Sequence, residues 1–183
     1  MLAGYHAVMP PSTPLLTPFV DGWANYNRLI VDALRGLPDE AVALRTAPQQ
    51  WTVWQLASHV AGVRAYWFGL VGVDTTALRD RFRVTATTVP GLDLEDAGWE
   101  DDETHPRSSE ELVAALTDTW TMMAEQLERW TPDDLAAEFE RPYGRTRRFS
   151  RAWVVWHCLE HDLHHGGEIS QVLGANGYTA PDL

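Results

Sequence analysis

Apolar residues recur with the spacing of an amphipathic helix in four stretches of the chain. The first predicted helix begins at Thr17, an N-cap residue followed by Pro18, and ends before Gly36. The second begins at Thr52 and runs to about Val71. At both starts a threonine side chain can accept a hydrogen bond from the backbone N–H groups that the first turn leaves unpaired. The first part of the chain is therefore predicted to form two helices.

Two more helices are predicted in the second half of the chain. Ser108 and Glu111 have the spacing of a capping box and begin the third helix, whose apolar side extends to Trp130. Ser150 caps the fourth helix, which runs to Leu173. Four amphipathic helices joined by short connections and one long one are typical of an all-α protein, and specifically of a four-helix bundle.

The connections refine this picture. Residues 1–16 contain several prolines and are predicted to form an extended arm, which leaves residues 17–177 as a single bundle domain. The long connection of residues 73–107 is acidic, and it is interpreted either as a segment with small elements of its own or as acidic disorder. Residues 138–149 form either a small hairpin or a loop.

Composition narrows the classes of partner. The net charge of -12 argues against nucleic acid, which is bound by clustered basic surfaces. The single cysteine fits a reducing compartment, and neither a targeting signal nor a long apolar run is present, so we expect a cytoplasmic protein without a membrane partner. The nine tryptophans allow a homodimer, although one core could also contain them all.

Four of the seven histidines lie close together in the fourth predicted helix: His157, His161, His164 and His165. Histidines four residues apart share a helix face and can bind one metal ion. At 100° per residue, His161 and His165 fall within the apolar arc, whereas His157 and His164 lie on its flank with Glu160. The inward pair is therefore His161 and His165, and the other three side chains are expected at the surface or around the site.

A third ligand must come from another helix. On the second predicted helix, His59 lies at the edge of the apolar face, while Ser58 and Ala61 are expected to point away from it. A histidine at such an edge can line a pocket between two helices, so His59 is our third candidate ligand. Taken alone, it is better interpreted as a hydrogen-bonded boundary histidine, since single histidines on helices are common.

The remaining candidates for metal binding are weaker. His6 lies in the proline-rich arm and His105 in the acidic connection, and both are expected to be solvated. Cys158 is interpreted as a small buried hydrophobic residue rather than a ligand.

Two segments of the sequence resemble a known family. Residues 51–60 (WTVWQLASHV) and 160–169 (EHDLHHGGEI) are similar to the tryptophan-led second helix and the final helix of the DinB-like, or DinB/YfiT, superfamily of metal-binding four-helix proteins. In helix order the resemblance extends from about Leu15 to Gly177. One departure is Gly167-Glu168, where the family often has arginine or glycine followed by glutamine.

The resemblance implies a metal site. Carried over residue by residue, the family's three-histidine site falls on His59, His161 and His165, the same trio that helix facing selects. Three imidazole ligands leave a coordination position open, as in catalytic rather than structural zinc sites. We expect a divalent ion, zinc or nickel first, with iron or manganese as alternatives.

The resemblance also suggests a reaction. Relatives include bacillithiol S-transferases and mycothiol-dependent maleylpyruvate isomerase, so the leading hypothesis is a metal-dependent thiol S-transferase with a low-molecular-weight thiol cosubstrate and a small electrophile. A metal-dependent hydrolase and a metal-binding, stress-related protein without catalysis are the alternatives. Glu160, Tyr66 and His164 are candidates for a general base, and none is assigned.

Overall fold

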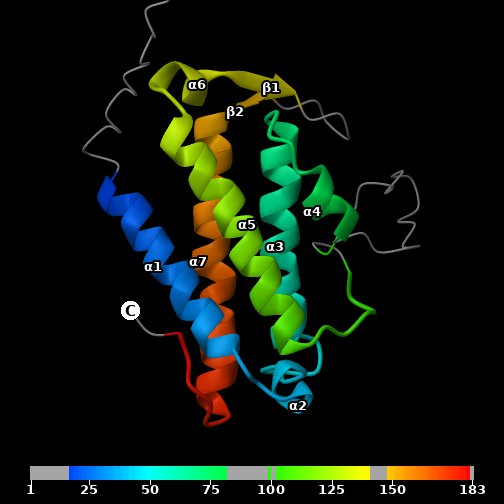
Figure 1. Cartoon of the computed structure of the whole chain (residues 1–183). Helices are drawn as coiled ribbons and strands as arrows, with labels where there is room; N and C mark the ends of the chain where they lie inside the picture. Colours follow the sequence, from blue (N-terminus) through cyan, green and yellow to red (C-terminus); the bar gives the residue numbers. More distant parts are fainter. Residues whose placement is uncertain (1–16, 82–98, 100–101, 141–147, 182–183) are drawn as a thin grey trace, which may run out of the picture.

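The computed structural model describes residues 17–81, 99, 102–140 and 148–181 of the chain. Four long helices pack side by side (Figure 1): α1 (Thr17–Leu34), α3 (Val53–Leu70), α5 (Ser109–Arg129) and α7 (Arg151–Ala175). The described part also contains three short helices and two strands: α2 (Asp39–Val42), α4 (Thr76–Arg81), α6 (Pro132–Ala136), β1 (Glu138–Glu140) and β2 (Arg148–Ser150). The all-α fold predicted from the sequence is confirmed.

Three of the four predicted helix starts have the expected cap. Thr52 Oγ1 accepts from the backbone N–H of Gln55, whose side chain accepts from the Thr52 N–H at 2.8 Å, and Ser108 with Glu111 repeats this capping box. The Ser150 hydroxyl accepts from the first turn of α7. These bonds satisfy N–H groups that a helix start would otherwise leave unpaired. The start of α1 differs by one residue, because Thr17 is already helical.

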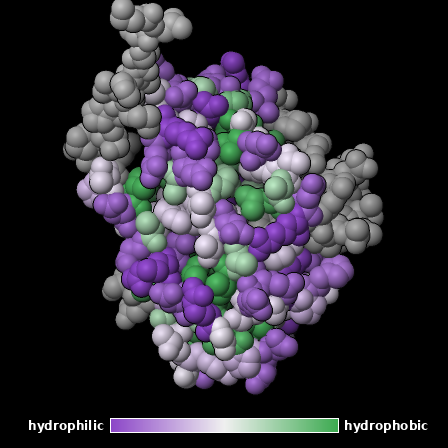
Figure 2. Space-filling model, viewed as in Figure 1, coloured by the Kyte–Doolittle hydropathy of each residue, from purple (hydrophilic) through white to green (hydrophobic). Residues whose placement is uncertain are grey.

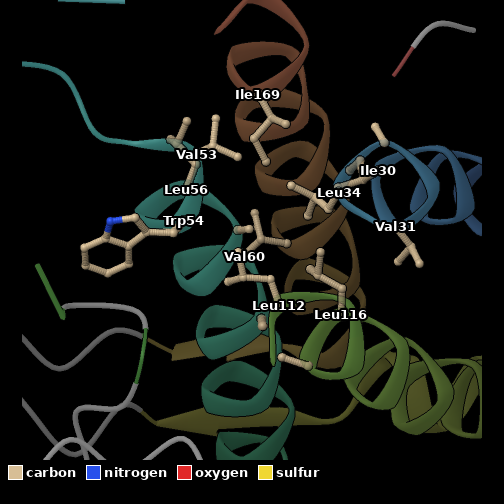
Figure 3. Packing of buried hydrophobic residues seen from close by; sticks show 14 of the residues in the cluster. Ile30, Val31, Leu34, Val53, Trp54, Leu56, Val60, Leu112, Leu116 and Ile169 are labelled. Carbon is tan, nitrogen blue, oxygen red and sulfur yellow. The ribbon is translucent and has the colours of Figure 1, made fainter. Parts of the chain in front are cut away.

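Helix α3 is the central element of the fold. It contacts both α5 and α7, and α1 contacts α5 and α7 in turn. The result is an apolar interior to which all four long helices contribute (Figure 3): Ile30, Val31, Leu34, Val53, Trp54, Leu56, Val60, Leu112, Leu116 and Ile169.

The position of α3 corrects one expectation about its faces. Ser58 and Ala61 do not point away from the core but are fully buried. A helix packed between two neighbours buries more than one stripe, so its sequence cannot be read as having a single buried face. The Ser58 hydroxyl accepts a long hydrogen bond of 3.5 Å from the Arg107 guanidinium, which partners its polar atom.

Gly166 brings α1 close to α7. The Tyr26 ring occupies the space that a Cβ atom at position 166 would need, and the Tyr26 hydroxyl donates to the Leu163 carbonyl oxygen at 3.4 Å. A larger side chain at 166 would push the two helices apart. This close approach holds α7 against α1 at Gly166, the residue that follows His165.

Part of the long connection packs against the bundle. Trp99, Asp102 and Arg107 are buried, the Arg107 guanidinium lies 4.1 Å from the Trp99 ring centroid, and it pairs with the Asp102 carboxylate. The connection also contains α4. Its residues 82–98 and 100–101, and the predicted arm of residues 1–16, lie outside the described residues.

The hairpin reading of residues 138–149 is supported at both of its ends. Strands β1 and β2 pair antiparallel, with Phe139 opposite Phe149, and residues 141–147 between them lie outside the described part. Phe149 is buried and its ring contacts Trp67 edge-to-face at 5.5 Å. The strands thus cover one end of the helices.

Of the helices in the described residues, none has the length and apolar character needed to cross a bilayer. The face seen in Figure 2 is largely hydrophilic, with hydrophobic residues scattered over it. The large apolar side chains that remain exposed are Phe19, Trp153, Trp156 and Leu163.

Candidate metal centre

Three histidines from two helices meet on one side of the α3–α7 contact. His59 comes from α3, and His161 and His165 from successive turns of α7. One nitrogen of each ring lies within 4.8 Å of the others, and the ring centroids are 4.5 to 4.9 Å apart. The structure thus brings together the three residues selected from the sequence, in a geometry that can hold a metal ion.

Local structure explains how the trio forms. The spacing of four residues places His161 and His165 one above the other on α7, and the capping box at Thr52 fixes the start of α3, from which His59 projects. Trp51 lies over the pair formed by His59 and His165, with its ring centroid 4.7 and 6.0 Å from theirs. The indole therefore covers one side of the cluster.

The imidazoles of His161 and His165 are held in the neutral form that binds metals. Burial, with a smaller contribution from the neighbouring His165 and His59, lowers the pKa of His161 to about 3. Burial also lowers the pKa of His165, although the hydrogen bond to Glu168 opposes this shift. Both rings therefore stay uncharged near neutral pH.

One ring nitrogen in the trio has no partner in the described part of the chain. The Nδ1 atom of His161 is buried and makes no hydrogen bond there. A buried polar atom without a partner costs free energy, so such atoms are uncommon unless a water molecule, a ligand or an ion completes the site. The residues present therefore fit a bound cation, to which the Nδ1 atom of His161 could donate its electron pair.

Glu168 supports the trio from one turn further along α7. Its Oε2 lies 2.6 Å from the Nδ1 atom of His165, which leaves the Nε2 atom of that ring for an ion. Glu168 Oε1 also lies 3.8 Å from His164 Nε2, and the three side chains form a second group with metal-ligand spacing. Glu168, one of the two residues that depart from the family pattern, thus lies within hydrogen-bond distance of a candidate metal ligand.

The other predicted candidates lie around the trio rather than in it. His157 stacks on Trp153 at 4.7 Å and pairs with Glu160, and His164 is exposed. Tyr66 is half-buried and contacts the Trp67 ring. None of these residues is assigned as a general base.

The structure also describes two of the weaker candidates for metal binding. His105 is exposed and contacts the Asp102 carboxylate, and Cys158 is fully buried, as expected for a small hydrophobic residue. His6 lies outside the described residues.

A second polar cluster, which the sequence analysis missed, lies deep between the same two helices. Arg64 of α3 and Asp162 of α7 form a fully buried ion pair, with 2.6 Å between Nη2 and Oδ2. The indole N–H of Trp23 also donates to Asp162, and the Arg64 Nη1 group donates to the Leu116 carbonyl and to Thr119. Every polar group of the pair is thus satisfied from inside the fold.

A signal for this pair was present in the sequence. Arg64 follows Val60 by four residues, and Asp162 follows Cys158 by four, so each charge lies on an apolar stripe of its helix. Opposite charges on the buried faces of two helices of one bundle predict that the charges pair, because an isolated buried charge is very costly.

A cavity of about 480 Å³ adjoins the trio. His165 and Glu168 of α7 line it together with Trp51 and the loop that precedes α3. The candidate metal centre therefore borders a space of the size that small molecules occupy in proteins.

Comparison with known proteins places the chain among DinB-like structures. The family model described as DinB superfamily matches residues 23–169. The crystal structure of a DinB-like protein from Bacillus cereus has a TM-score of 0.66 at 19% identity, covering 92% of this chain and 97% of that one. A conserved protein from Enterococcus faecalis has a TM-score of 0.60 at 11% identity, with coverage of 84% and 92%. No curated protein matches the chain.

Proposed function

The chain belongs to the DinB superfamily, and from that premise we propose that it binds one divalent metal ion through His59, His161 and His165. The observation that carries this proposal is the buried, unpartnered Nδ1 atom of His161 within a cluster of three imidazoles. Zinc and nickel are the first expectation for three nitrogen ligands, and iron or manganese would also be accepted.

We further propose that the protein transfers a low-molecular-weight thiol to a small electrophile. When bound, the ion would lower the pKa of a thiol and favour its thiolate. The thiolate sulfur attacks an electrophilic carbon, the new C–S bond forms as the bond to the leaving group breaks, and the leaving group departs with that electron pair. The proton lost by the thiol passes to solvent, so the reaction needs no oxidant or reductant.

The residues of the chain would position the metal ion and form the walls of the site around it. The three imidazoles converge from α3 and α7, and the carboxylate of Glu168 holds the His165 ring through Nδ1. The Trp51 indole covers one side of the cluster. The adjoining cavity of about 480 Å³ leaves room for a thiol-sized molecule, which favours a working site over a sealed structural one.

The proposal includes two expectations about context. We expect a cytoplasmic protein, because low-molecular-weight thiols are kept reduced there. We also expect a homodimer that covers Trp153 and Trp156, which are large and exposed on α7. Light scattering at several protein concentrations checks the dimer, and a constant monomer mass would exclude it.

Metal content tests the site. The purified protein, loaded with zinc or nickel and dialysed, should retain about one equivalent per chain, and the His161→Ala/His165→Ala variant should retain none. His157→Ala is the matched control, because it removes a histidine of the same helix that lies outside the trio. Unchanged stoichiometry in the double variant would show that these residues are not the ligands.

Activity is tested separately. A panel of low-molecular-weight thiols with monobromobimane or chlorodinitrobenzene should give conjugation that depends on the metal. The chelated protein is the control for the spontaneous reaction. A metal-loaded protein with no rate above that control for any thiol would favour the non-catalytic reading.

A further inference from the structure

The cavity beside the trio has a chemical character of its own. One wall is the loop before α3, with Thr46, Gln49 and Gln50, and the opposite wall is α7, with Glu168 and Gln171. His165 also lines it, so a ligand that reaches the metal centre through this space would extend its remaining atoms along these side chains.

The described residues that line the cavity include no lysine or arginine. Glu168 is the one acidic side chain among them. A second carboxylate stands close by, because Glu103 accepts a hydrogen bond of 3.0 Å from the indole N–H of Trp51. Arg45 precedes the loop but donates to the Pro48 carbonyl oxygen and does not line the cavity.

The groups that the walls do offer are neutral and polar. The side chains of Gln49, Gln50 and Gln171 each carry amide donors and an acceptor, and Thr46 adds a hydroxyl. Such groups bind hydroxyl and amide groups well. They supply no counter-charge for a carboxylate or a phosphate.

We propose that this cavity receives the body of the thiol cosubstrate and selects a thiol that carries uncharged hydroxyl or amide groups over one that carries a carboxylate. The inference rests on the proposed function, since the sulfur is taken to lie at the histidine trio. A carboxylate in the cavity would lie beside Glu168 and would find no cationic side chain among the lining residues, whereas a hydroxyl group would find neutral partners.

The experiment uses two thiols of equal length. Cobalt(II) accepts the same imidazole ligands, and a thiolate bound to it gives a near-ultraviolet charge-transfer band that reports binding without turnover. Titration of the cobalt-loaded protein with 4-mercapto-1-butanol and with 4-mercaptobutyrate should give a dissociation constant that is about tenfold lower for the alcohol.

A charge placed on the wall sharpens the test. Gln171 is exposed and lies six residues beyond His165, so Gln171→Lys should leave the trio intact. Gln171→Lys should reduce or reverse the preference for the alcohol over the carboxylate, because the lysine ammonium group can pair with the carboxylate. Gln126→Lys makes the same change of charge on α5, beside a different surface cavity, and should keep the preference of the original protein.

The outcomes separate the two proposals. Equal or tighter binding of the carboxylate by the original protein, or a preference that Gln171→Lys leaves unchanged, would overturn the inference about the cavity. A metal-loaded protein that gives no charge-transfer band with either thiol would instead overturn the proposed thiol chemistry.

Discussion

Two polar clusters lie between α3 and α7, and they differ in how completely the fold satisfies them. The pair Arg64 and Asp162 is buried, and Trp23 and Thr119 complete its hydrogen bonds. The trio that includes His161, the residue just before Asp162, retains a buried nitrogen without a partner in the described residues and borders a cavity. A saturated network holds helices in place, whereas an incomplete one is built to be completed by something else.

The largest expected effect comes from breaking the saturated cluster. Asp162→Ala leaves Arg64 charged and unpaired in the core, which should lower the free energy of unfolding by about 3–5 kcal/mol. Chemical denaturation measures this loss. Asp32→Ala is the control, because its pairs with Arg28 and Arg35 are exposed, and it should cost at most about 1 kcal/mol. Similar values for the two variants would mean that the buried pair does not hold the helices together.

The incomplete cluster should respond to metal instead. Zinc at about 100 times its dissociation constant should stabilise the original protein by about 2.7 kcal/mol, because it binds only the folded trio. The His161→Ala/His165→Ala variant should fold without metal and show no such gain. A thermal melt with and without zinc measures both. Equal stabilisation of the variant would place the ion elsewhere.

A smaller effect on metal binding is expected from Glu168, which contacts a candidate ligand but is not one of the three histidines. Glu168→Ala removes the acceptor for His165 Nδ1 and should weaken metal affinity by about 10 to 100-fold. Glu168→Gln keeps an acceptor without the charge and should fall between. Competition with a coloured chelator gives the affinities. Glu160→Ala is the control, because Glu160 pairs with His157 outside the trio, and an equal loss there would remove the special role of Glu168.

The smallest expected effect per unit change in conditions is on the pH dependence of stability, because one proton changes the free energy of unfolding by at most about 1.4 kcal/mol per pH unit. Burial and the neighbouring imidazoles lower the folded-state pKa of His161 to about 3, below the value of about 6.5 in the unfolded chain. The unfolded state therefore binds the proton first, and the metal-free protein should lose stability as the pH falls from 6.5 towards 3. His161→Ala should lower the slope of the free energy of unfolding against pH by at most the contribution of one proton. Unfolding curves across that range decide it, and identical slopes would contradict the shift.

Helix starts and ligand facing were predictable from the sequence because they are local. The capping boxes at Thr52 and Ser108 need only residues three apart, and the i, i+4 spacing alone places His161 and His165 on one face. His59 could be selected because it lies at the edge of an apolar stripe. Its choice over other histidines still depended on two helices being neighbours.

Other features of the buried helix faces were missed or wrongly predicted. Ser58 and Ala61 were expected to point outward, yet they are buried because α5 covers a second side of α3. Arg64 and Asp162 were not paired in advance, although each lies on an apolar stripe. A helical wheel gives the direction of a side chain, but which helix meets it depends on packing of the whole bundle.

The four long helices, three of their caps and the pair His161 and His165 follow from the spacing of residues within one segment of the sequence, whereas the choice of His59 also required that two helices be neighbours. The tertiary structure was needed to show that Asp162 of α7 pairs with Arg64 of α3, and that a cavity opens beside the trio between α7 and the loop before α3. The reason is that each of these depends on atoms from segments far apart in the chain, whose distances are fixed by how the four long helices pack together.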